Sequence, residues 1–162
     1  MSDLKSTLQK IISLRNDGKT IGFTCSCFDI LHAGHYLMLK DSRNQCDFLV
    51  VGLQTDPTKD LEYRMKSEGK NKNMPIQDYE ERLIQIEGCR YVDWVVKYEG
   101  EDELYEIIRT INPDVRVLGS DWEGKEYTGH DLPPKIHWHR RDHDYSTSNL
   151  RKRVFEAEKR KN

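Results

Sequence analysis

The sequence lacks long hydrophobic runs and a recognisable export signal. Its longest apolar stretches, such as FLVVGL at 48–53, are far too short to cross a bilayer. The first twenty residues, MSDLKSTLQKIISLRNDGKT, contain neither a long apolar core nor a small-residue cleavage site. These absences predict a cytoplasmic protein with no membrane partner.

Cysteine and unbalanced charge are also scarce. The four cysteines are too few for a disulfide scaffold, so we expect free thiols in a reducing compartment. Lysine and arginine number 26 against 28 aspartates and glutamates, a net charge of -2 at pH 7. Because nucleic-acid binders usually carry a basic excess, we expect no nucleic-acid partner. The 162 residues predict a single domain, 1–162, large enough for a hydrophobic core.

Hydrophobic periodicity predicts strands that alternate with helices. The predicted strands are 20–28, 47–55, 91–96, 114–119 and 135–139. The predicted helices are 3–16, 32–45, 76–89, 101–111 and 146–161, with Ile76, Tyr79, Leu83 and Ile86 on one face of the third. Such alternation is typical of an α/β fold, a parallel sheet flanked by helices. The predicted helix 3–16 precedes the first predicted strand, so it is an extra element at the N-terminal end of the α/β unit.

Polar clusters follow four of the predicted strands. His32 and His35 follow the first strand and Asp56 follows the second. GSDWEG (119–124) follows the fourth, and RRDHDYSTS (140–148) follows the last. Ligands of parallel sheets bind beyond the carboxyl ends of the strands. We therefore expect these clusters to converge on one crevice.

The paired histidines favour phosphate binding. A helix that begins near Ala33 offers unpaired backbone N–H groups and the positive end of its dipole. Gly34 would let a ligand approach the backbone closely. The imidazoles of His32 and His35 can donate hydrogen bonds to phosphate oxygens.

Two other interpretations of the histidines stay open. Both rings could simply be packed or solvated. A metal could also bind there, with Cys25 and Cys27 as further ligands from one face of a strand. An H-x-x-H pair without HExxH or paired CxxC motifs gives that second interpretation little support.

The remaining clusters each have a functional and a structural interpretation. Lys70, Lys72 and Arg82 could form a cationic flap over a polyphosphate, or a solvated loop and a surface arginine. GSDWEG could be the edge of a nucleotide pocket or a turn. The STS at 146–148 could aim a second helix N-terminus at phosphate, or only cap that helix, with Ser146 or Thr147 as N-cap.

Together these blocks resemble the cytidylyltransferase family of HxGH nucleotidyltransferases. The matching segments are FDILHAGH (28–35), Lys72 ten residues before Arg82, VLGSDWEG (117–124) and RDHDYSTS (141–148). The resemblance extends from about residue 20 to about residue 153. It implies a Rossmann-like α/β fold of the HxGH nucleotidyltransferase type.

The resemblance implies transfer of CMP from CTP to a small phosphorylated alcohol, with release of pyrophosphate. DWEGK (121–125) is most similar to the branch that uses glycerol 3-phosphate, which is therefore the expected acceptor. DILHAGH (29–35) and VDWVV (92–96) also resemble the branch that makes ADP-activated heptose. An ATP-dependent adenylyltransferase acting on a heptose phosphate is thus the alternative. The family further implies Mg²⁺ with the triphosphate, and a homodimer.

The resemblance also assigns site residues, position by position. The implied catalytic residues are His32, His35, Lys72 and Arg82. The implied nucleotide-binding residues are Cys27, Phe28, Asp29, Gly34, Gly119, Asp121, Trp122, Arg141, Ser146 and Thr147. The implied acceptor-binding residues are Asp56, Lys70 and Arg82. No metal ligand is implied among the side chains.

The chain departs from the family pattern at a few positions. Ser26 stands where the family usually has glycine. Asp142 and Asp144 stand in the closing block, where the family pattern has no acid at either position. A regulatory module that binds a nucleotide without transferring it is therefore a further alternative.

Overall fold

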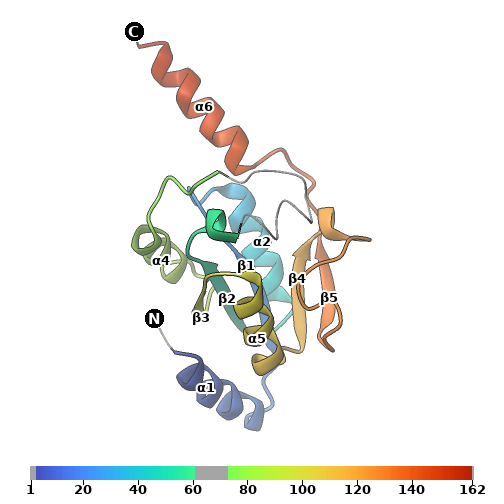
Figure 1. The fold of residues 1–162 in the computed structure, drawn as a ribbon. Coiled ribbons are helices and arrows are strands. Elements are labelled where there is room, and N and C mark those ends of the chain that lie inside the picture. Colours follow the sequence, from blue (N-terminus) through green and yellow to red (C-terminus); the bar gives the residue numbers. More distant parts are fainter. Residues whose placement is uncertain (1–2, 61–72, 162) are drawn as a thin grey trace.

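The computed structural model describes residues 3–60 and 73–161, which form a parallel sheet flanked by helices (Figure 1). The strands are β1 (Ile21–Ser26), β2 (Phe48–Gln54), β3 (Trp94–Tyr98), β4 (Val115–Gly119) and β5 (Lys135–His139). They lie in the order β3-β2-β1-β4-β5, and each neighbouring pair is parallel. The direction of winding reverses between β1 and β4. The predicted Rossmann-like α/β fold is confirmed.

In the described ranges, two helices cover each face of the sheet. The pair on one face is α1 (Leu4–Asn16) and α5 (Glu101–Ile111), and the pair on the other is α2 (Ala33–Asn44) and α4 (Tyr79–Glu87). Short 3₁₀ turns, η1 (Pro57–Asp60) and η2 (Ser120–Trp122), follow β2 and β4. These helices cover the two faces of the sheet but not the edge formed by the carboxyl ends of the strands. Loop residues and ligands can therefore gather at that edge.

The interior strand β2 explains why the sequence shows a continuous apolar run. Val50 packs into the core beneath α1 and α5, whereas Leu49, Val51 and Leu53 pack beneath α2 and α4. Successive side chains of a strand point to opposite faces, so a strand covered on both sides needs apolar residues throughout.

The starts of two predicted elements are wrong by three residues. The predicted helix 76–89 begins only at Tyr79, where Asp78 caps it, and Ile76 lies outside the helix with 60% of its surface exposed. The predicted strand 91–96 begins at Trp94, which pairs with Val50, and continues to Tyr98. Tertiary hydrogen bonds fix both starts, because the N–H of Ile76 and that of Leu49 donate to distant aspartates.

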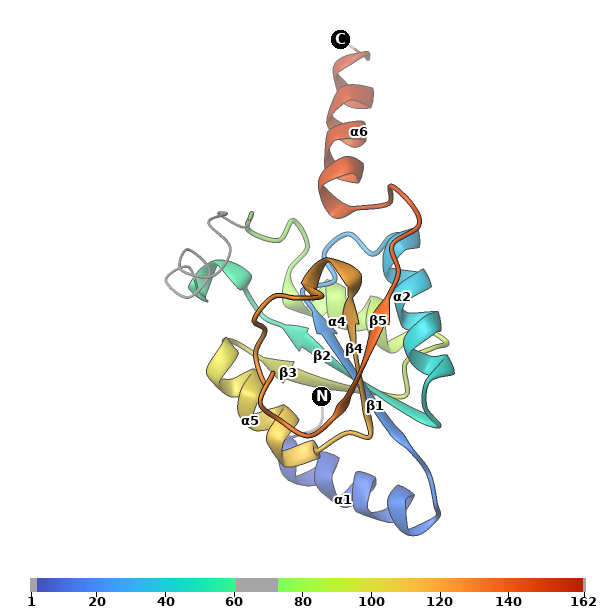
Figure 2. The same cartoon turned by 90° about the vertical axis from the view of Figure 1, so that its right-hand side faces the viewer.

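The last helix, α6 (Thr147–Lys159), projects away from the sheet (Figures 1 and 2). None of its residues is buried, and Val154 and Phe155 are 53% and 61% exposed. Its base is tied to the body by Arg151, whose Nη1 lies 3.4 Å from the Asp29 carboxylate and 3.3 Å from the Met74 carbonyl oxygen. Among the helices of the described ranges, none is long and apolar enough to cross a membrane.

Candidate active site

The turn between β1 and α2 has an unusual backbone held by a buried aspartate. Phe28 and Ile30 adopt positive φ angles of 49° and 46°, a conformation that side chains disfavour. Between them, the Asp29 carboxylate accepts hydrogen bonds from the N–H groups of Ile76 and Gln77, both at 3.0 Å. Gln77 returns a contact, since its Oε1 accepts from the N–H of Ile30 at 2.8 Å. These bonds fix the conformation of the turn that leads into the start of α2.

The two histidines form the cap of α2, which begins at Ala33 as predicted. His32 is the N-cap, and its Nδ1 accepts from the N–H of Gly34 at 3.1 Å. The Nδ1 of His35 accepts in return from the N–H of His32 at 3.4 Å. The rings stack with their centroids 3.8 Å apart. Imidazoles thus take the roles that serine and glutamate play in an ordinary capping box.

This capping arrangement fixes the proton positions on both rings. A neutral imidazole whose Nδ1 accepts carries its proton on Nε2. Burial, followed by the positive charge of a protonated His32 and of Arg141, lowers the pKa of His35 to about 3. Burial, Arg141 and His143 also lower the pKa of His32. At neutral pH, both rings are therefore neutral donors through Nε2–H.

The closing block lies against this cap. The Nε2 of His32 is 3.2 Å from the Thr147 hydroxyl oxygen, and Ser146 caps α6 by accepting from the Asn149 N–H at 3.1 Å. A Cβ on Gly34 would lie only 3.0 Å from the Tyr145 carbonyl oxygen and 3.0 Å from the His32 ring. The close approach of the loop therefore requires a glycine in the first turn of α2.

The GSDWEG segment joins the same cluster through an ion pair. Asp121 and Trp122 lie in η2, and the Asp121 carboxylate is 3.7 Å from Nη1 of Arg141. A Cβ on Gly119 would lie 2.4 Å from the Asp121 carboxylate, so that side chain folds back over the glycine. The ends of β1, β4 and β5 therefore meet, as their polar clusters predict.

Arg82 is buried, so the interpretation of this residue as a surface arginine is wrong. It is only 1% exposed, and its guanidinium donates to the carbonyl oxygens of Gln54 (2.6 Å), Cys27 (2.8 Å) and Thr55. Its Nε also donates to the carbonyl oxygens of Gln77 and Asp78, each at 3.2 Å. Arg82 thus joins the ends of β1 and β2 to the start of α4.

The acceptor-binding predictions are only partly located. Asp56 follows β2, and its carboxylate accepts from the N–H and the hydroxyl of Thr58 at 2.9 and 2.7 Å. The Thr58 bonds, chiefly that of the hydroxyl, keep the pKa of Asp56 below its usual value despite some burial. Lys70 and Lys72 lie outside the described residues.

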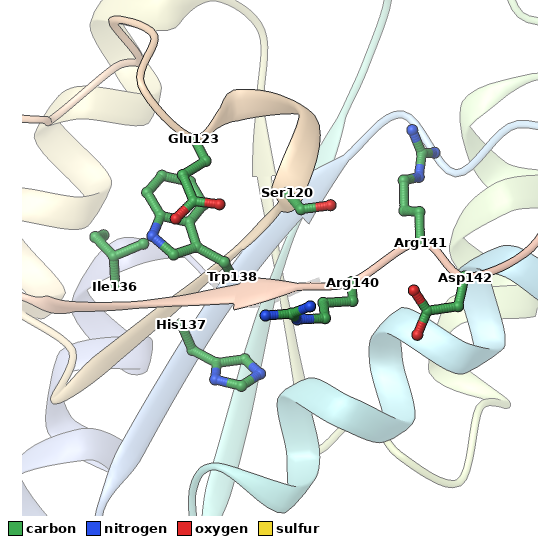
Figure 3. Close-up of a pocket in the computed structure, with 8 residues that line it drawn as sticks. All are labelled: Ser120, Glu123, Ile136, His137, Trp138, Arg140, Arg141 and Asp142. Atoms are coloured by element: carbon green, nitrogen blue, oxygen red, sulfur yellow. The ribbon is translucent and has the colours of Figure 1, made fainter.

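A hollow of about 520 Å³ adjoins Arg141 along the edge strand β5 (Figure 3). Its lining residues are Ser120, Glu123, Ile136, His137, Trp138, Arg140, Arg141 and Asp142. In Figure 3 the side chains of His137 and Trp138 leave β5 on opposite sides, as successive strand residues do. The hollow gives room for part of a ligand next to Arg141.

A polar cluster between α2 and β5 has no counterpart among the sequence predictions. One oxygen of Asp41 accepts from Nε2 of His137 at 3.0 Å and from Nδ1 of His139 at 2.8 Å. Burial alone would raise the pKa of Asp41, but the hydrogen bonds from His139 and His137 outweigh it and lower the pKa. The cluster holds the helix that carries His32 and His35 against the strand that leads to the closing block. No local pattern marks it, because its members are more than 90 residues apart in the chain.

The metal interpretation gains no support from the geometry. Over residues 3–60 and 73–161, no three or more His, Cys, Asp or Glu side chains are arranged to hold a metal ion. The four cysteines are thiols rather than disulfides. The Nδ1 atoms of His32 and His35 instead accept the capping hydrogen bonds of α2.

Comparison with known proteins supports the motif-based resemblance. Residues 23–153 match the family model described as cytidylyltransferase-like. A protein of Wolinella succinogenes named "Bifunctional protein HldE" is 41% identical over 133 residues, 82% of this chain and 26% of that relative. Proteins with the same name in Aliarcobacter butzleri and Mesorhizobium japonicum are 38% and 35% identical, over 90% and 82% of this chain. The chain spans 29% and 25% of those two relatives.

Solved structures show the same fold. A lipopolysaccharide core biosynthesis protein from Thermoplasma volcanium is 27% identical, with a TM-score of 0.56 over 80% of this chain and all of that one. A pantoate-beta-alanine ligase from Francisella tularensis has the same TM-score of 0.56 over 89% of this chain and 70% of that one. Because the ligase is only 16% identical, it is evidence for the fold alone.

These findings correct the predicted substrate pair. The prediction of a CTP-dependent enzyme for glycerol 3-phosphate is wrong, because the relatives that cover most of this chain are named HldE. The reason is physical. The HxGH and STS blocks are predicted to contact phosphates, which CTP and ATP share, so these blocks do not distinguish the two nucleotides.

Proposed function

The chain belongs to the cytidylyltransferase-like family of nucleotidyltransferases, and from that premise we propose that it transfers AMP from ATP to a heptose phosphate. The name HldE belongs to the branch of the family that makes ADP-activated heptose. Because this chain spans only 24% to 30% of those relatives, the proposal concerns the transfer step alone.

In the proposed reaction, a phosphate oxygen of the acceptor attacks the α-phosphorus of ATP. A new P–O bond forms, the bond from the α-phosphorus to the oxygen bridging to the β-phosphate breaks, and pyrophosphate leaves with that electron pair. The nucleophile is already an anion, so the reaction needs no strong general base. The protein has to position the two anions and neutralise the charge that develops between them.

The observation that carries the proposal is the pair of neutral imidazoles at the start of α2. Both Nδ1 atoms are occupied by the capping bonds, so Nε2–H is the group of each ring that would donate to a phosphate oxygen. His32 would exchange the Thr147 hydroxyl, 3.2 Å from its Nε2, for that oxygen. Held donors of this kind contribute roughly 3–4 kcal/mol each to transition-state stabilisation in comparable sites. The positive charge of Arg141 lies near both rings and would draw the triphosphate to them.

Other site residues complete the proposal. Thr147 and the capped start of α6 would contact the phosphates beside His32. The buried Arg82 would act through the strand ends that it joins, since the described structure already occupies its donors with carbonyl oxygens. The roles of Lys72, Lys70 and Asp56 stay predictions.

Magnesium and the homodimer also stay predictions. The described side chains do not fit a protein-held magnesium ion, because they provide no cluster of carboxylate and imidazole ligands. Any magnesium would therefore enter as part of the nucleotide substrate, and we assign it no step.

The test is pyrophosphate release with magnesium, crossing ATP and CTP against heptose phosphates, glycerol 3-phosphate, phosphocholine and phosphoethanolamine. We expect release with ATP and a heptose phosphate. His35→Ala should reduce turnover by at least 100-fold without unfolding the protein, because it removes one held donor. His130→Ala is the matched control, since His130 is an exposed histidine of the β4–β5 loop. Release only with CTP, or full turnover in His35→Ala, would refute the proposal. Tight ATP binding without release for any acceptor would instead favour the regulatory module.

A further inference from the structure

His143 is a third histidine at the phosphate-facing cap, and neither the motifs nor the resemblance assigned it a role. It lies in the loop between β5 and α6, two residues after Arg141. Its Cε1 is 3.1 Å from the position of a Cβ built on Gly34, the glycine in the first turn of α2. The ring therefore faces the same backbone turn that His32 and His35 cap.

The hydrogen bonds of the ring determine which nitrogen is free to donate. The Nδ1 of His143 accepts from the N–H of Tyr145 at 3.2 Å. In the neutral ring the proton then lies on Nε2, as in the other two histidines. Nε2 is bonded to the Cε1 atom that faces Gly34, so the donor lies one bond from that contact.

This donor is buried and has no partner among the described residues. The Nε2 atom of His143 belongs to the few buried side-chain polar atoms of residues 3–60 and 73–161 that make no hydrogen bond. Leaving a buried donor unpaired costs about 1–3 kcal/mol, so such atoms in folded proteins usually have a use. A histidine kept only for packing would gain nothing from the unpaired nitrogen.

The charges around the ring favour an anion as the hydrogen-bond partner of His143 Nε2. The start of α2 presents the positive end of its dipole, and Arg141 adds a full positive charge close by. His143 lies close enough to His32 to be one of the causes, after burial and Arg141, that lower the pKa of His32. An oxyanion between these rings would accept from the Nε2–H of His143 and be stabilised by the charge of Arg141.

We infer that His143 binds the triphosphate, its Nε2–H donating to a phosphate oxygen beside His32 and His35. The inference rests on the proposed function for the identity of the nucleotide, and it adds a third donor, supplied by the loop before α6. Its chemistry requires a polyphosphate, so inorganic tripolyphosphate serves as a probe independent of turnover.

The first experiment follows the imidazole ¹⁵N signals of histidine-labelled protein during titration with tripolyphosphate. We expect the Nε2 signals of His143, His32 and His35 to shift together, while those of His130 stay unchanged. A His143 signal that stays fixed while the other two shift would overturn the inference, and so would the absence of any tripolyphosphate binding. Because this titration needs no acceptor, it decides the role of His143 even if the wild-type chain transfers no AMP.

The second experiment compares two variants of His143. His143→Phe keeps a ring next to Tyr145 but has no donor, and His143→Gln keeps an N–H near the position of Nε2. We expect His143→Phe to lower kcat/KM for ATP by about 10- to 100-fold and to raise KM for ATP, with partial recovery in His143→Gln. The urea midpoint should change little in His143→Phe, because removal of the unpaired buried donor offsets the loss of the bond from the Tyr145 N–H. A lower midpoint with an unchanged KM for ATP would mean that the ring is only structural, as would wild-type kinetics.

Discussion

On the α2 side of the candidate site, residues 27–35 are held by partly buried hydrogen bonds to other elements, whereas on the β5–α6 side residues 140–147 are exposed or half-buried. Asp29 and Arg82, 6% and 1% exposed, hold the first side from within the core. The second side rests on the ion pair of Asp121 with Arg141 and on the contact of Thr147 with His32. A site can thus keep its donors fixed on one side while the facing loop varies without disturbing the core. The four substitutions below test this contrast, from the largest expected effect to the smallest.

Removing the buried cation should break the fixed side. Arg82→Met would leave the carbonyl oxygens of Cys27, Gln54 and Thr55 without their shared donor. We expect the free energy of unfolding to fall by about 3–5 kcal/mol in urea denaturation. Arg109→Met is the control, because Arg109 is exposed and pairs with Glu106 at the surface, and it should change stability by less than about 0.5 kcal/mol. Equal losses in the two variants would contradict the assignment of Arg82 to the core.

Acid should weaken the fixed side through His35. Its pKa is about 3 in the folded chain, against about 6.5 for an unfolded histidine. Between these values only the unfolded chain binds the proton, so the contribution of His35 is complete above pH 6.5 and declines as the pH falls. From pH 7 to pH 5 the free energy of unfolding should lose about 1–2 kcal/mol through this group. Urea denaturation of wild type and His35→Gln at both pH values isolates the effect, and an equal pH dependence in the two proteins would disprove it.

Asp41 joins the two sides, so its loss should have an intermediate effect. Asp41→Asn weakens the bonds from His137 and His139, and we expect a loss of about 1 kcal/mol at pH 7, modest because the carboxylate is 30% exposed. The folded pKa of Asp41 is lowered, so its contribution is present above about pH 4 and declines as the pH falls further. The stability difference between wild type and variant should therefore narrow from pH 5 to pH 3. A difference that widens over this range would rule out the assigned sign.

The projecting helix should tolerate substitution best. Phe155 lies on α6 with 61% of its surface exposed, so Phe155→Ser should change the free energy of unfolding by less than about 0.5 kcal/mol and leave turnover unchanged. Phe23→Ser, at a fully buried position of β1, is the matched comparison and should cost more than about 3 kcal/mol. A large loss in Phe155→Ser would mean that α6 packs against something in solution, which would remove the contrast between the two sides.

Local sequence patterns predicted the elements well where capping and periodicity determine them. The helix at 101–111 and the strand at 135–139 have the predicted bounds, and α2 begins at Ala33. Ser146 is the N-cap of α6, as expected of a serine before a helical run. The predictions were less accurate at Ile76 and Trp94, where a hydrogen bond or a strand pairing to a distant residue determines the backbone.

The sequence by itself determined the class of the fold and the family, because both follow from local features. Alternating apolar runs specify strands and helices, and the order of the HxGH, GSDWEG and STS blocks is typical of the family. Phosphate as the ligand of the histidine cap stays a prediction. Only the tertiary structure decided which polar side chains are buried in structural hydrogen bonds. Arg82 and Asp41 bond to Gln54 of β2 and His139 of β5, and His143 lies close to Gly34 of α2, 109 residues away in the chain. Those partners depend on the order β3-β2-β1-β4-β5, and no local segment encodes the packing that sets this order.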